Sequence, residues 1–196
     1  MKQPTIASSC IAFLVLFICF ILLISGVHAL TSPRVAAFEL MQRQRAEKQS
    51  RAAQILKPLF PEATGFVKLG TTAFHDSSAD YYRAENGSTV AGYAIHAFGK
   101  GYQNMIHAIV GVNPDFSIRS VNIISQSETE GLGARMLEEP FLKQFVGKNG
   151  RRLRVITQGD SSDAITAISA ATISSRALTE DAIKKAVIFL EEQVQK

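Results

Sequence analysis

The chain has 196 residues, which fits one domain of ordinary size plus a short extra segment and excludes two large domains. Hydrophobic residues make up 46% and charged residues 19% of the chain, a balance that excludes a disordered or low-complexity protein. The net charge of +4 arises from 21 basic and 17 acidic residues scattered along the chain, so we predict no nucleic-acid partner.

The first predicted element is a membrane-spanning helix within residues 1–30. Residues 10–27 are almost wholly apolar, and as a helix rising about 1.5 Å per residue they would reach roughly 27 Å, close to the thickness of a bilayer core. A cleaved signal peptide is the alternative, because Lys2 is basic and Val27-His28-Ala29 has the form of a cleavage site. We favour the uncleaved anchor, since the segment is longer than the ~7–15 residues of a usual signal-peptide core. Either interpretation exports the rest of the chain.

The two cysteines limit the chemistry of everything that follows. Cys10 and Cys19 lie in the apolar segment, so the remainder of the chain has none. This excludes disulfides, thiolate zinc sites, cysteine-ligated iron–sulfur clusters and cysteine nucleophiles there. The four histidines do not share metal-ligand spacing, and we predict no metal site. Redox chemistry in the folded part would therefore need a bound organic cofactor.

A membrane-proximal helical linker is predicted over residues 31–61. Ser32-Pro33 is typical of a helix cap followed by proline at the first helical position. Apolar residues recur at helical spacing on both sides of a charged stretch at residues 42–51. Residues 57–61, Lys-Pro-Leu-Phe-Pro, should end the helix, because proline disfavours the helical conformation in the residue before it.

The residues after the linker, 62–196, are predicted to form one domain of the α+β class. Asn86-Gly87 is typical of a tight hairpin turn, and Asn113-Pro114-Asp115 of a second turn. The strands that flank these turns are Asp80–Glu85, Thr89–Phe98, Asn104–Val112 and Phe116–Ser125. The later elements are a short helix at Leu137–Val146, a strand at Leu153–Thr157 and an amphipathic helix at Ile173–Val194. The apolar face of this last helix carries Ala177, Ile183, Val187 and Leu190.

The most informative motif precedes the terminal helix. Residues 169–175, Ser-Ala-Ala-Thr-Ile-Ser-Ser, combine small residues with four hydroxyls. The first turn of a helix has unpaired N–H groups and the positive end of the helix dipole, which together stabilise a phosphate. An ordinary helix cap formed by Thr172 or Ser174 explains the same residues, so the pattern alone leaves both interpretations open.

Two other segments have the composition to place backbone and an aromatic ring beside a planar ligand. Residues 127–134, Ser-Glu-Thr-Glu-Gly-Leu-Gly-Ala, put two glycines around Leu132 between a strand and a helix, where glycine allows close backbone approach. Residues 99–104 supply Gly101 and Tyr102 with neighbouring amides. A plain glycine turn and a hairpin loop explain these segments equally well.

Taken together and in this order, the three segments resemble the FMN-binding domain of the G subunits of Rnf-type electron transport complexes, which are related to the C subunits of Nqr-type sodium-pumping complexes. In that family a threonine before the final helix carries FMN through a phosphoester bond that a flavin transferase makes. The resemblance places this threonine at Thr172, with Ser169 as the leading hydroxyl and Ala171 as the small residue before it. It implies a domain of mixed sheet and helix with covalent FMN.

The resemblance also implies which residues surround the cofactor. These cofactor-binding residues are Thr172, Ser169, Ala171, Ser174, Ser175, Glu128, Thr129, Gly131, Leu132, Gly133, Gly101 and Tyr102. The sequence departs from the family pattern at Thr166, where Asp is usual, at Ala170, where Gly is usual, and at Glu130, where Pro is usual. The alanine matters if the turn needs a positive φ, because alanine is penalised there.

We therefore expect a membrane-anchored electron carrier with covalent FMN, an electron-transfer subunit of an Rnf-type ion-translocating oxidoreductase complex rather than a stand-alone enzyme. An FMN-binding sensor or regulatory protein at the membrane and an exported binding domain without flavin are the alternatives. The resemblance implies an inner-membrane protein whose flavin domain lies on the exported, periplasmic side. Its expected partners are the other membrane subunits of the complex, a flavin transferase and the lipid bilayer.

Overall fold

The computed structural model describes residues 17, 40–44, 46–159 and 163–195, and the chain falls into two compact units, Met1–Arg51 and Ala52–Lys196. In the first unit, residues 40–44 and 46–51 are helical. The predicted membrane span at residues 10–27, apart from Phe17, and the predicted helix start at Ser32-Pro33 lie outside the described residues. Among the residues that are described, no helix has the length and hydropathy needed to cross a membrane.

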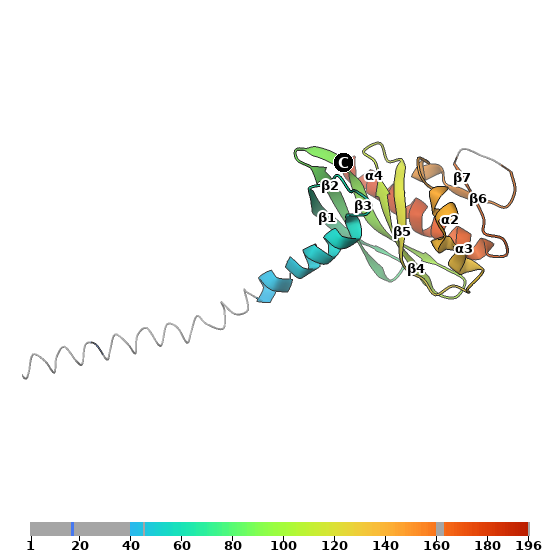
Figure 1. The fold of residues 1–196 in the computed structure, drawn as a ribbon, viewed down its shortest axis with the longest axis horizontal. Coiled ribbons are helices and arrows are strands. Elements are labelled where there is room, and N and C mark those ends of the chain that lie inside the picture. The colour runs from blue at the N-terminus through green and yellow to red at the C-terminus, as the bar shows by residue number, and fades with distance from the viewer. Residues whose placement is uncertain (1–16, 18–39, 45, 160–162, 196) are drawn as a thin grey trace, which may run out of the picture. The chain divides into compact units, whose positions relative to one another are not determined.

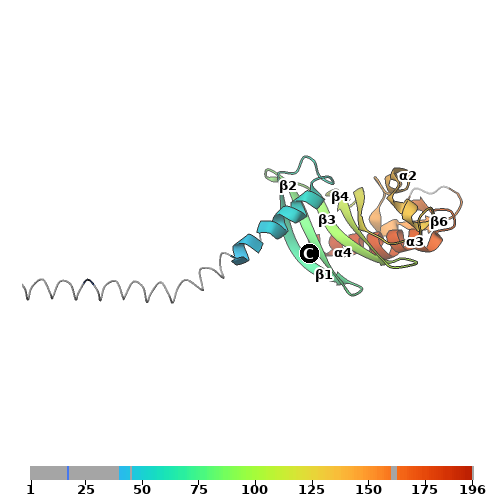
Figure 2. The ribbon, with the colours of Figure 1, turned by 60° about the horizontal axis from the view of Figure 1, so that its bottom comes forward.

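The second unit begins with a short helical segment. Residues 52–56 are helical, and the helix ends directly before Lys57-Pro58. The Lys57 ammonium donates a hydrogen bond to the carbonyl oxygen of Ala63 at 2.7 Å, which closes the turn that follows. Residues 52–61, which the sequence assigns to the linker, pack on the sheet of this unit through the buried Leu56 and Phe60 (Figure 2).

A five-stranded antiparallel sheet forms the body of the second unit, with the strands side by side in chain order (Figure 1). The strands are β1 (Gly65–Phe74), β2 (Ser77–Asn86), β3 (Thr89–Lys100), β4 (Met105–Val112) and β5 (Ile118–Ser125). Both predicted hairpins are confirmed, with strand boundaries that differ by a few residues. The sequence does not predict β1, because it is an edge strand whose apolar residues do not strictly alternate with polar ones.

The chain between the sheet and the terminal helix consists of short elements. They are a 3-10 helix at Gly133–Leu137, α2 at Glu139–Lys143, a second 3-10 helix at Gly150–Arg152, and the parallel strands β6 (Arg154–Ile156) and β7 (Ala164–Thr166). The helix predicted over Leu137–Val146 is therefore shorter than expected, because the extended backbone of Glu138 separates the first 3-10 helix from α2. The strand expected at Leu153–Thr157 is confirmed as β6. The sequence does not predict β7, since three residues are too few to show a strand period.

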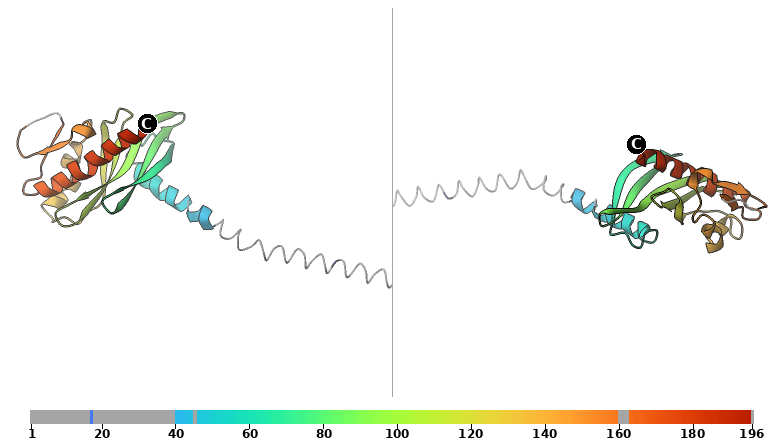
Figure 3. Two further views of the ribbon diagram at one scale, coloured as in Figure 1. Left: turned by 180° about the vertical axis from the view of Figure 1, so that it is seen from behind. Right: turned by 90° about the horizontal axis from the view of Figure 1, so that it is seen from above.

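The predicted terminal helix is confirmed. α3 (Thr172–Arg176), a π-helical stretch (Ala177–Lys184) and α4 (Lys185–Val194) follow one another without a break, and together they lie across one face of the sheet (Figure 3). All four residues assigned to the apolar face of this helix are buried. They share a core with Ile95, Ala97, Ile106 and Ala108 of the central strands.

A smaller core covers the opposite face of the sheet. Ala94 of β3 and Ile109 of β4 pack there with Leu56, Leu59 and Phe60 from the segment before β1. Successive residues of a strand point to opposite faces, so β3 contributes Ala94 to this core and the adjacent residue to the helix side. The centre of the sheet is therefore buried on both faces.

Candidate functional site

Three segments that are far apart in the sequence enclose a pocket of about 460 Å³. One is the loop between β3 and β4, the second follows β5, and the third is the start of α3. The lining residues are Tyr102, Glu128, Thr129, Leu132, Gly133, Ala170, Ala171, Thr172, Ile173 and Ser174. The volume falls within the roughly 300–1,000 Å³ that is typical of cofactor sites.

Glu128 connects all three segments. It is only 6% exposed, and its carboxylate accepts hydrogen bonds from the backbone N–H groups of Tyr102 at 3.1 Å, Gln103 at 3.0 Å and Asn104 at 3.4 Å. The Ser174 hydroxyl of α3 donates a fourth hydrogen bond at 2.5 Å. Burial alone would raise the pKa of the Glu128 carboxyl, but the hydrogen bonds from Ser174 and from the loop outweigh burial and lower it. Glu128 is therefore ionised at neutral pH.

Two glycines make this close contact around Glu128 possible. A Cβ atom on Gly133 would lie 2.7 Å from the Ser174 hydroxyl oxygen and 2.8 Å from the Glu128 Cβ. A Cβ atom on Gly101 would lie 2.3 Å from a Glu128 carboxylate oxygen. Any larger residue at either position would push the three segments apart, so the glycines are needed for contact between segments of the protein.

The start of α3 presents hydroxyl groups in two different settings. Thr172 is the first residue of the helix and lines the pocket, and its hydroxyl makes no hydrogen bond within the described part of the chain. Ser175 is fully buried, and its hydroxyl donates to the Ala171 carbonyl at 2.9 Å and accepts from the Ile168 N–H at 3.0 Å. Ser175 therefore stabilises the turn before the helix, whereas Thr172 offers a free hydroxyl to the pocket.

Ala170, in the turn before the helix, has a left-handed backbone. Its φ is +61°, a conformation that costs a residue with a Cβ roughly 1–2 kcal/mol relative to glycine. This is the position at which the sequence departs from the glycine of the family pattern. The turn thus requires a positive φ, and the alanine is strained there.

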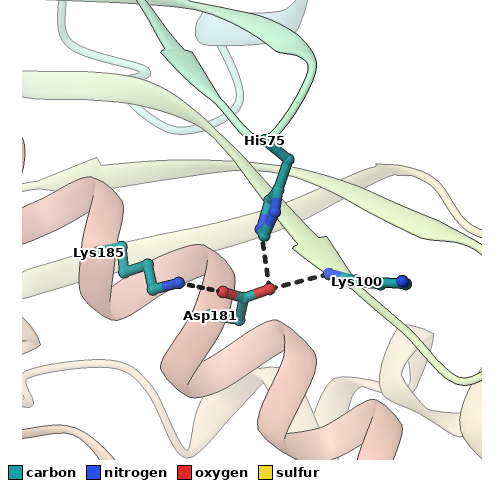
Figure 4. Close-up of polar contacts among 4 residues, drawn as sticks. All are labelled: His75, Lys100, Asp181 and Lys185. Atoms are coloured by element: carbon teal, nitrogen blue, oxygen red, sulfur yellow. Dashed lines mark hydrogen bonds and ion pairs between the residues drawn. The ribbon is translucent and has the colours of Figure 1, made fainter.

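A second carboxylate supports the β3–β4 loop from its other end. Asp181, in the π-helical stretch, accepts a hydrogen bond from the backbone N–H of Lys100 at 3.0 Å, and the same oxygen lies 2.9 Å from His75 Nε2 (Figure 4). The Lys185 ammonium donates to its other oxygen at 2.5 Å. Burial would raise the pKa of Asp181, but the hydrogen bonds from Lys185 and Lys100 and the charge of Lys185 lower it. Lys100 directly precedes Gly101, so Asp181 and Glu128 hold the two ends of the same loop.

Comparison with known proteins gives the family. The FMN-binding domain family matches residues 101–187, which include all three pocket segments. The G subunit of the proton-translocating ferredoxin:NAD(+) oxidoreductase complex of Clostridium ljungdahlii is 33% identical over 171 residues, which cover 86% of this chain and 84% of that protein. The chain belongs to this family of G subunits. The G subunit of the ion-translocating oxidoreductase complex of Methanosarcina acetivorans is also 33% identical, over 86% of this chain and 88% of its own length.

One solved structure shows a partial likeness to this chain. The C subunit of the Na(+)-translocating NADH-quinone reductase from Parabacteroides distasonis superimposes with a TM-score of 0.49 and 22% identity, over 56% of this chain and 59% of that one.

The structure brings most of the predicted cofactor-binding residues of this family member together. The predicted residues that line the pocket are Tyr102, Glu128, Thr129, Leu132, Gly133, Ala171, Thr172 and Ser174. The predicted residues that are not in its lining are Gly101, Gly131, Ser169 and Ser175. Ala170 and Ile173 line the pocket without having been predicted, and their position on either side of the Ala171-Thr172 pair is the signal that would have found them.

The second unit also contains a polar cluster outside the pocket, which we call the histidine cluster (Lys68, Asp80, Tyr82, His96 and His107). His96 Nδ1 lies 2.8 Å from His107 Nε2, Tyr82 donates to Asp80 at 3.3 Å, and Lys68 pairs with Asp80 at 2.7 Å. Burial and the neighbouring His96 lower the pKa of His107 to about 4. In the described part of the chain, no group of three or more His, Cys, Asp or Glu side chains has the arrangement of a metal site.

Proposed function

We propose that this protein is a membrane-anchored electron carrier that holds FMN through a phosphoester bond to the Thr172 hydroxyl, as a subunit of an Rnf-type ion-translocating oxidoreductase complex. One observation supports this above the others. The free Thr172 hydroxyl lies in the wall of a pocket in which the three motif segments meet. The family match over residues 101–187 makes FMN the expected occupant.

The pocket suits the proposed cofactor in shape and chemistry. Helical residues continue from Thr172 to Val194, so the N–H groups of the first turn and the helix dipole favour a phosphate beside Thr172. The side chains of Tyr102, Leu132 and Ile173 are 69%, 39% and 57% exposed, and they offer apolar surface to a planar ring at the pocket rim. The small Ala171 leaves room for close approach beside Thr172.

The residues of the chain would position the cofactor and would not take up or release electrons themselves. Bound FMN supplies the reversible electron uptake and release, which no side chain in the folded domain provides. Attachment would replace the Thr172 hydroxyl proton with the phosphoryl group of FMN, with release of water or of the leaving group of the flavin donor, and the phosphodiester would carry one negative charge for the helix N–H groups. Glu128 and Asp181 hold the loop that carries Tyr102. The covalent bond would prevent loss of the flavin outside the cytoplasm.

The proposed partners and location follow from the relatives and the N-terminal sequence. The relatives in Clostridium ljungdahlii and Methanosarcina acetivorans are named as subunits of oxidoreductase complexes, so the other subunits of such a complex are the proposed partners. A flavin transferase would attach the cofactor. Residues 10–27 would anchor the protein in the inner membrane, with the flavin domain on the periplasmic side.

Mass spectrometry of the full-length protein coexpressed with an active flavin transferase tests the proposal. The peptide that contains Thr172 should be heavier by FMN less water, and the protein band should fluoresce on a denaturing gel. Thr172→Ser should be labelled less efficiently, because serine keeps the hydroxyl but loses the methyl group that restricts χ1. FMN found on another residue would contradict the assignment to Thr172, and a chain without flavin would contradict the proposed function.

A further inference from the structure

Acidic and basic side chains are not balanced in the lining of the pocket. Among the residues that line it, Glu128 is the only one with an ionisable acidic or basic side chain apart from the Tyr102 phenol, and there is no lysine or arginine. Four hydrogen bonds donated to the Glu128 carboxylate favour its ionised form and lower the pKa of the carboxyl. The pocket wall therefore carries one negative charge and no positive charge.

Among the described residues, no lysine or arginine forms an ion pair with Glu128. Arg135, which follows the glycine segment, bonds to Glu138 at 3.2 Å. Lys185 donates to Asp181, which is not among the residues that line the pocket. Arg176 of α3 is exposed to solvent, where salt and water screen its charge. The four donors to the carboxylate are instead neutral groups, namely one hydroxyl and three backbone N–H groups.

We infer that Glu128 is a positioning residue whose buried negative charge lowers the midpoint reduction potential of the flavin held in this pocket. The inference rests on the proposed function. Uptake of two electrons from an external reductant and one proton from solvent leaves the reduced isoalloxazine with one more negative charge than the oxidised ring. A fixed negative charge in the pocket wall disfavours that product, and water screens the repulsion poorly at a 6% exposed group.

Redox titration of the full-length flavinylated protein with Glu128→Gln tests the inference. Glutamine keeps the size and a carbonyl acceptor for the N–H groups of Gln103 and Asn104 but removes the charge, and its NH2 group replaces the oxygen that accepts from Tyr102 and Ser174. At the potential where the natural protein is half reduced, we expect the ratio of reduced to oxidised flavin to rise at least tenfold. For a two-electron couple this ratio corresponds to a shift of about 30 mV to more positive potential.

Two matched variants separate charge from structure. Glu128→Asp keeps the charge and should change the ratio less than threefold, although its shorter side chain alters the hydrogen bonds. Glu130→Gln removes a charge from an exposed residue of the same segment and should also change the ratio less than threefold. An unchanged potential in Glu128→Gln, or an equal shift in Glu128→Asp, would overturn the inference.

A variant that adds a negative charge to the pocket tests the inference if Glu128→Gln carries no flavin. Thr129→Asp adds a carboxylate to the pocket lining and still offers an acceptor to Gln103 Nε2, which bonds Thr129 at 2.8 Å. It should lower the ratio of reduced to oxidised flavin by about three- to tenfold, more than Glu130→Gln because residue 129 lines the pocket and less than Glu128→Gln because residue 129 is exposed; no shift would overturn the inference. Absence of flavin from the natural protein would instead mean that the proposed function fails.

Discussion

The pocket cluster (Glu128, Ser174 and the backbone N–H groups of residues 102–104) and the histidine cluster differ in what their polar groups face. In the histidine cluster the side chains pair with one another, as His96 does with His107 and Lys68 with Asp80. In the pocket cluster the paired groups form the wall of a cavity, and the unpaired hydroxyl of Thr172 lies beside them. A gathering of polar side chains therefore does not by itself indicate a site. A cavity with a free reactive group is the stronger sign.

The largest effect expected from this comparison is on covalent labelling. Thr172→Ala should eliminate flavin fluorescence from the denatured protein band, because the proposed attachment atom is gone. The double variant His96→Gln/His107→Gln should keep full labelling, since these residues are not in the pocket lining. Gel fluorescence after coexpression with a flavin transferase measures both. Full labelling of the Thr172→Ala protein would show that the free hydroxyl beside the pocket cluster is not the attachment site.

The next largest effect is on stability, and it should distinguish Ser175 from Ser169, the serines three residues on either side of Thr172. Ser175→Ala leaves the buried Ile168 N–H without its acceptor and should lower the free energy of unfolding by about 2 kcal/mol. Labelling of Thr172 should persist where the variant is folded. Urea unfolding measures the loss, and Ser169→Ala, at an exposed turn residue, is the control with an expected change within about 0.5 kcal/mol. Equal losses in both variants would contradict the assigned role of Ser175.

The histidine cluster should make the free energy of unfolding depend on pH. The unfolded chain protonates His107 near its ordinary pKa of 6.5, whereas the folded protein does so only near pKa 4. Between these values the unfolded state binds more protons, so the free energy of unfolding should fall as the pH decreases from 6.5 toward 4. We expect a loss on the order of 1–2 kcal/mol, because the half-buried ring is partly screened by solvent.

Urea unfolding at several pH values between 7 and 5 measures this loss before the carboxylates titrate. The double variant His96→Gln/His107→Gln should flatten the dependence, and the pocket variant Ser174→Ala should leave it unchanged. A pH dependence that survives in the double histidine variant would assign the effect to other groups.

The smallest effect concerns the strained turn at the pocket. Ala170→Gly should raise the free energy of unfolding by roughly 1 kcal/mol, since the left-handed φ of +61° disfavours alanine. It should also raise labelling if the turn positions Thr172. Thermal unfolding and the mass of the labelled peptide measure the two outcomes. Ala167→Gly, outside the left-handed region, is the control and should not stabilise the protein.

Local patterns in the sequence determined much of the fold and the motif segments. Asn86-Gly87 and the alternation on either side of it predict the β2–β3 hairpin, because turn chemistry and strand period are properties of neighbouring residues. The apolar spacing of Ile183, Val187 and Leu190 predicts the buried face of the last helix for the same reason. The order of the motif segments around Thr172 was enough to indicate the family that the comparisons show.

Only the tertiary structure decided which groups meet. Ser174 and Glu128 are separated by 46 positions, and Ser175, next in the chain, turns instead to Ile168 and Ala171. The contact between His96 and His107 likewise depends on the register of β3 against β4, which spacing along one chain does not contain. Contacts of this kind arise from the packing of whole elements, so residue type and local period leave them undetermined.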